Sequence, residues 1–151
     1  MRRAGLLLAA MLTTGLIAAG CGDDDGGDGG NGDEALTKEE FVAQGNQICR
    51  EGNQELDAIA NQSFQREPTP EQEERFVNDE VIPNIQGQID EIRALESPEG
   101  DEETINGILD DAEAALDEIR ADPSLIEADP GPFAEVNQQL REYGLSTCGS
   151  G

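Results

Sequence analysis

Beyond the first 35 residues, apolar residues recur at steps of three and four, the spacing of one face of an α-helix. No segment shows the strict alternation expected of a half-buried strand. The predicted fold is therefore all-α, an up-and-down four-helix bundle with short connections over residues 36–149. The four helices are expected near residues 37–59, 69–95, 101–120 and 133–143.

The first predicted helix has a clear start and an apolar face that includes two glycines. Thr37-Lys38-Glu39-Glu40 fits a capping box, and Leu36 precedes it where a hydrophobic staple would begin. Gly45 and Gly52 each weaken the helix by about 1 kcal/mol relative to alanine. Three interpretations are open: close approach of another backbone, a gap in the core, or merely suboptimal packing. The whole stripe is Phe41, Gly45, Ile48, Gly52, Leu56 and Ile59.

Two positions interrupt or end the later helices. Pro83 lacks the N–H that would bond to residue 79, so we expect a kink there, or a helix that ends near Val81 and a new one after it. Gly144 is well placed as a left-handed stop after the last helix. Leu145 would then fold back on Leu140, as in a Schellman motif.

Residues 1–20 have the features of a secretion signal, with two arginines followed by an apolar run too short to cross a membrane as a helix. Leu16-Ile17-Ala18-Ala19-Gly20-Cys21 resembles the lipobox of bacterial lipoproteins, although Ala18 departs from the usual leucine. The resemblance implies cleavage before Cys21 and a diacylglycerol on its thiol. This lipid would anchor the protein to the cell membrane, on the outer face of the cytoplasmic membrane. The alternative is an ordinary secretory signal with a chance cysteine.

Residues 21–35 are expected to form a disordered, acidic tether. The stretch Gly22–Glu34 contains no large apolar residue, so it cannot bury enough surface to offset its ordering entropy. We expect loose, screened attraction of cations to this linker. A specific calcium loop is the alternative, but Gly27 and Asp28 stand where an EF-hand requires an acidic or amide residue followed by glycine.

Two cysteines remain once Cys21 is lipidated. Cys49 lies beside the apolar stripe and Cys148 just past the last helix, and in an oxidising compartment two such thiols usually pair. Closing a loop of about 100 residues contributes about 4–5 kcal/mol in the chain-entropy model. Asn46 and Asn53 share the face of Cys49 and are candidates to bond the backbone of residues 145–148. The competing interpretation is a reactive thiol or a two-cysteine metal site.

Composition excludes several activities. The chain has 34 acidic and 9 basic residues, a net charge of −25, which disfavours nucleic acid and anionic lipid as partners. It contains no histidine, which removes the commonest general base and every catalytic arrangement that needs one. The acids of the third helix are expected to form a solvated face. We therefore expect no enzymatic activity, no cofactor and no metal site.

Several short motifs resemble small predicted secreted or lipid-anchored proteins of high-GC Gram-positive bacteria. The resemblance covers residues 36–149 and implies an extracytoplasmic location and a disulfide, but no further site. Gly45 and Gly52 depart from the alanines expected in that group. The matching motifs are Leu36-Thr37-Lys38-Glu39-Glu40-Phe41, Ile48-Cys49, Asp129-Pro130 to Phe133, and Tyr143-Gly144-Leu145-Ser146-Thr147-Cys148-Gly149.

These features predict a non-catalytic interaction or structural module of the cell envelope, with an unknown protein partner that is cationic or neutral. The alternative is a module that binds a small apolar or lipid-like ligand between its helices, in a gap near the two glycines and Pro83. An enzyme that uses carboxylates alone is disfavoured, because 34 acids make chance pairs certain.

Overall fold

The computed structural model describes residues 35–150, and these residues are all-helical with no strand, as predicted. The expected signal peptide, Cys21 and nearly all of the acidic linker lie outside the described residues. The α-helices are α1 (Lys38–Ser63), α2 (Pro70–Phe76), α3 (Ile82–Arg93), α4 (Glu102–Ala121) and α5 (Ala134–Tyr143). They are joined or extended by a π-helical turn η1 (Val77–Val81) and by 3₁₀ turns η2 (Pro123–Glu127) and η3 (Cys148–Ser150).

The segments α2, η1 and α3 follow one another without a break and form one helical rod. α3 begins at Ile82, directly after Val81, but no helix ends there, so the predicted break near Val81 is absent. The chain stays helical there. The Ile82 N–H bonds to the Val77 carbonyl, five residues back, and this wider turn precedes the missing donor of Pro83.

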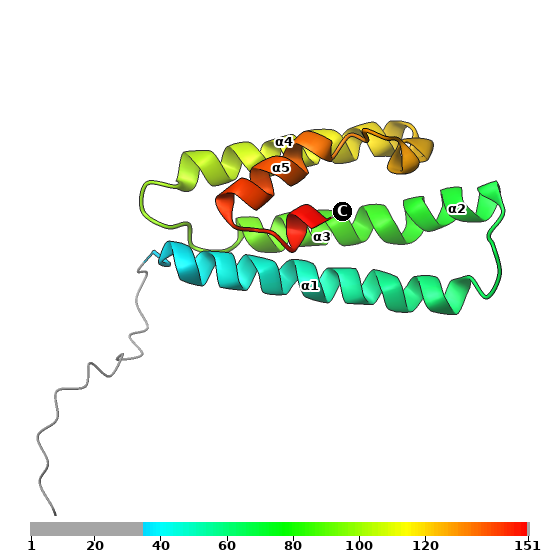
Figure 1. Ribbon diagram of the computed structural model, residues 1–151, viewed down its shortest axis with the longest axis horizontal. Coiled ribbons are helices and arrows are strands. Elements are labelled where there is room, and N and C mark those ends of the chain that lie inside the picture. Colours follow the sequence, from blue (N-terminus) through cyan, green and yellow to red (C-terminus); the bar gives the residue numbers. More distant parts are fainter. Residues whose placement is uncertain (1–34, 151) are drawn as a thin grey trace, which may run out of the picture. The chain divides into compact units, whose positions relative to one another are not determined.

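α3 lies at the centre of the domain, with α1 on one side and α4 on the other (Figure 1). α5 packs on α4, and the C-terminal turn η3 crosses back to contact both α5 and α1. Four helices, α1, α3, α4 and α5, each contribute one apolar face to a common core, whereas α2 has no buried residue. Its largest fully buried side chains are Phe41, Leu116, Ile119, Leu145 and Cys49.

Burial along α1 is uneven, and this corrects the prediction of one continuous buried stripe. Phe41, Gly45 and Cys49 are buried, whereas Leu56 and Ile59 are only half-buried and no residue after Cys49 is fully covered. The first half of α1 is therefore part of the core. The second half is covered only in part.

A local signal in the sequence sets the start of α1, and an aromatic contact follows its end. The predicted capping box is present: the Thr37 N–H donates to Glu40 Oε2 at 2.9 Å, and the Glu40 N–H donates to Thr37 Oγ1 at 3.3 Å. At the far end, Phe64 meets Phe76 edge to face, with ring centroids 5.0 Å apart. This aromatic pair holds the connection between α1 and α2.

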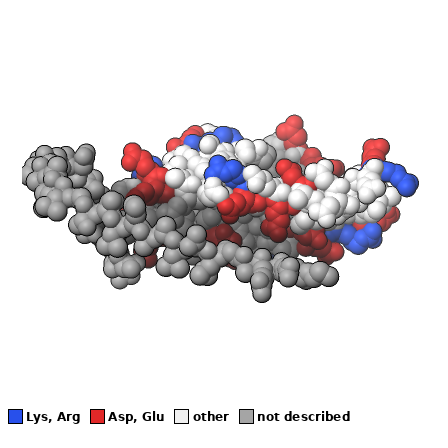
Figure 2. Space-filling model, turned by 90° about the horizontal axis from the view of Figure 1, so that it is seen from below, with Lys and Arg blue, Asp and Glu red and all other residues white. Residues whose placement is uncertain are grey.

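The described surface is strongly acidic. Figure 2 shows acidic side chains along much of the visible described surface and basic ones in isolated places. Ion pairs are few and exposed: Lys38 with Asp101, Arg93 with Asp110 and Glu113, and Arg120 with Asp117. Pairs of this kind contribute little to stability, so most of the acidic charge is balanced by solvent and counterions.

Candidate functional site

The predicted disulfide is confirmed. Cys49 and Cys148 are joined with a Cα–Cα distance of 5.1 Å across 99 residues of sequence. Cys49 is buried, with 2% of its surface exposed. The bond fixes the C-terminal turn against the first half of α1.

Asn46 holds the same turn by hydrogen bonds. Its amide nitrogen donates to the Gly144 carbonyl at 3.0 Å, and its Oδ1 accepts from the Thr147 N–H at 2.8 Å. These bonds serve backbone groups that have no helical partner. Asn53, expected to share this task, makes no hydrogen bond to the turn in the described part of the chain. It lies on the wall of a pocket instead.

Gly144 ends α5 as predicted, with a φ of 118° that only glycine adopts without strain. The Leu145 N–H then bonds to the Leu140 carbonyl at 2.8 Å, which is the long bond of a Schellman motif. Leu145 is 2% exposed and fits directly against Gly45, where a Cβ would lie 2.5 Å from a Leu145 methyl.

Both glycines of the α1 stripe are sites of close packing, and of the three open interpretations the close approach fits best, although side chains approach rather than another backbone. A Cβ on Gly45 would meet Leu145, and a Cβ on Gly52 would lie 2.4 Å from the side-chain nitrogen of Gln88. The Gly52 carbonyl accepts from the Asn84 amide at 3.2 Å. Pro83 is exposed and opens no space in the core.

A pocket of about 680 Å³ lies next to these contacts, between α1, α3, α4, α5 and the connection before α5. Its walls are mainly aliphatic, with one face formed by residues 125–134. The sequence predicted only a short connection here, yet its residues Leu125 and Phe133 pack against the core. Apolar wall residues include Leu56, Ile85, Ile89, Leu125, Phe133, Val136 and Leu140.

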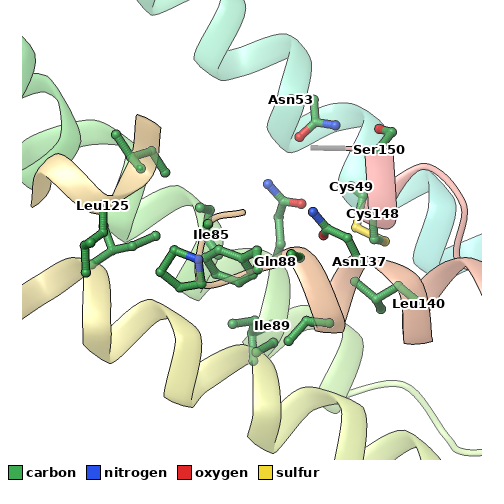
Figure 3. A pocket seen from close by; sticks show the side chains of 18 of the residues that line it. Cys49, Asn53, Ile85, Gln88, Ile89, Leu125, Asn137, Leu140, Cys148 and Ser150 are labelled. Atoms are coloured by element: carbon green, nitrogen blue, oxygen red, sulfur yellow. A yellow bond between two sulfur atoms is a disulfide. The ribbon is translucent and has the colours of Figure 1, made fainter. Parts of the chain in front are cut away.

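The two ends of the pocket differ in polarity (Figure 3). Leu125 lies at one end, Ile85 further in, and Ile89 near the middle, below Gln88. Polar side chains stand at the other end, beside the disulfide, and come from α1, α3, α5 and the C-terminal turn. They are Asn53, Gln88, Asn137 and Ser150. The cavity is thus amphipathic along its length.

The charged residues in the pocket wall are both acidic. Asp57 and Asp129 line it, and no lysine or arginine of the described chain does. Neither carboxylate has an ion pair or hydrogen-bond partner within residues 35–150. Sequence reasoning missed both, together with Gln88, because they belong to elements 30 or more residues apart and carry no local motif.

A second polar cluster joins α1, α4 and α5 outside this pocket. The Tyr143 hydroxyl donates to Asp101 at 2.7 Å, and the Lys38 ammonium lies 4.1 Å from the centre of the Tyr143 ring. Burial, and then the Asp101 carboxylate, raises the pKa of Tyr143 well above its ordinary value. The cluster has the character of a structural contact.

The carboxyl groups with shifted pKa values lie at helix starts. Hydrogen bonds from Thr37 lower the pKa of Glu40, and a bond to its own backbone N–H, followed by one from Thr69, lowers that of Glu71. Both shifts favour the ionised form, whereas a general acid needs the opposite shift.

Residues 35–150 contain no group of three or more side chains placed to bind a metal ion. No helix among them is long and apolar enough to cross a membrane. Comparison of the chain with protein-family models, curated proteins and solved structures finds no match in any of the three. The interpretation of the pocket therefore depends on the residues of this chain.

Proposed function

We propose that this protein is a membrane-anchored, extracytoplasmic binding module that holds a small apolar or lipid-like molecule in the pocket between α1, α3, α4 and α5. The observation that carries this proposal is the pocket of about 680 Å³ with mainly aliphatic walls. Small-molecule sites have this size and this composition, with a few polar groups that orient the ligand. The exposed residues Asn53, Asp57 and Asp129 give access to it from the surface.

The proposed location depends on the residues before the domain. The lipobox-like segment that ends at Cys21 supports a lipid anchor, and the Gly- and Asp-rich stretch after it supports a flexible tether. A disulfide between Cys49 and Cys148 is consistent with an oxidising compartment. We further propose that four helical rods, namely α1, the continuous α2–η1–α3, α4 and α5, form an up-and-down bundle. Rods that follow one another in sequence pack side by side.

Native mass spectrometry tests the proposal, with the protein gently extracted from its own host's membranes. We expect an extra mass of a few hundred daltons on the folded domain, lost on denaturation. A mass accounted for by the chain, the lipid on Cys21 and one disulfide would contradict the proposal of a bound ligand. It would favour the second candidate function given below.

The second candidate is a non-catalytic module that binds another envelope protein. The acidic surface in Figure 2 supports it, because such a surface attracts a cationic partner and accelerates encounter. Cross-linking on intact cells tests this candidate. Recovery of monomers only, under several cross-linking chemistries, would contradict it.

A further inference from the structure

The charge of the pocket wall restricts which amphiphile it can hold. We propose that the ligand is a cationic amphiphile: a single alkyl chain that ends in a primary ammonium group. This inference rests on the proposed function, because it names the chemical class of ligand for the same pocket. Its first support is the pairing of an aliphatic end with a polar end in one cavity (Figure 3).

The polar end suits a hydrogen-bond donor. Asn53 has no partner in the described part of the chain, and its amide oxygen is available to a ligand on the pocket wall. Gln88 uses its side-chain nitrogen to donate to Asn84 at 2.7 Å, and its oxygen is not used in that bond. An ammonium group has three donors and no acceptor, so it is complementary to these amide oxygens.

The carboxylates select the sign of the charge. Asp57 lies on α1 one turn after Asn53, about 6 Å along the helix axis. Asp129 lines the same cavity from the connection before α5. An anionic head group in this cavity would be repelled by both carboxylates of the wall, which contains no lysine or arginine of residues 35–150. A cation finds the opposite environment.

The test is calorimetric titration with three compounds that share one chain: decylammonium, decanol and decanoate. The mature chain from residue 21 is used with Cys21→Ser, so that neither lipid nor detergent competes for the pocket. At physiological ionic strength we expect decylammonium to bind roughly tenfold more tightly than decanoate, because two carboxylates attract one head group and repel the other.

A matched pair of variants separates the pocket from the overall negative charge. Asp57→Asn with Asp129→Asn removes both carboxylates of the wall, whereas Glu91→Gln with Glu99→Gln removes two exposed acids that do not line it. We expect the first pair to lose most of the preference for decylammonium and the second to keep it. Circular dichroism checks that both variants retain the helical fold.

Two results would overturn the inference in distinguishable ways. Equal binding of decylammonium and decanoate, or equal loss of preference in both double variants, would contradict the inference of a cationic head group. The pocket would still bind alkyl chains. Failure of all three compounds, decanol included, would contradict the proposed function itself.

Discussion

The two halves of α1 belong to one unbroken helix but have different surroundings. The first half, up to Cys49, is covered by the core and by the C-terminal turn, through Phe41, Leu145 on Gly45, and the disulfide. The second half, from Asn53 onward, has no buried residue and contributes to the open pocket. The difference indicates that the chain concentrates the stabilising contacts of α1 at one end and leaves the other end only partly covered.

The disulfide is expected to be the strongest of these contacts. Replacing both Cys49 and Cys148 by alanine should lower the free energy of unfolding by about 4–5 kcal/mol in the chain-entropy model, because a loop of 99 residues is released. Urea unfolding measures this change. A loss below about 1 kcal/mol would mean that hydrogen bonds and packing hold the turn without the covalent bond.

A large-to-small substitution in each half compares the packing directly. Phe41→Ala should cost about 4 kcal/mol, since Phe41 is fully buried, and Leu56→Ala should cost about 1 kcal/mol or less, since Leu56 borders open space. Urea unfolding of both variants provides the comparison. Equal costs would contradict the uneven packing of α1.

Alanine substitutions at a packed glycine and at an open one should change the stability in opposite directions. Gly45→Ala should destabilise by about 2 kcal/mol, because its new methyl group would meet Leu145 in a packed core. Gly107→Ala in α4 meets nothing within 4 Å and should stabilise by about 1 kcal/mol through helix propensity. Thermal unfolding distinguishes the two. A gain in stability at Gly45 would show that Leu145 can move aside.

The smallest expected effect concerns pH. The pKa of Tyr143 is raised in the folded state, so its contribution to stability is complete below the ordinary tyrosine pKa of about 10 and is lost as the pH rises further. Tyr143→Phe should cost about 1 kcal/mol at neutral pH by removing the bond to Asp101, and should flatten the fall in stability above pH 10. Unfolding measured from pH 8 to pH 11 tests this, and parallel curves for the two proteins would contradict it.

Local signals made much of this fold predictable. The capping box at Thr37, the stop at Gly144 and the fold-back of Leu145 each depend on residues within one or two turns, so the sequence contains the whole cause. The disulfide was predictable for a different reason. Only two cysteines remained to pair once Cys21 was assigned to a lipid.

Long-range contacts were not predictable in the same way. Gly45 and Gly52 show in the sequence that something is close, but not that Leu145 and Gln88 fill the space, since these partners lie 100 and 36 residues away. The pocket also results from contacts between residues far apart in the sequence. It depends on residues 125–134, which form one of its faces, and the place where such a connection folds has no local signature.

A single tryptophan in the pocket wall gives the decisive measurement, because the chain has none of its own. Phe133→Trp places the reporter in the wall, and Phe64→Trp places a matched one at the far end of α1. Titration with decanol should shift the emission of the first to shorter wavelength, with saturation, and leave the second unchanged. No shift at Phe133→Trp, or the same shift at both positions, would contradict a ligand site in this pocket.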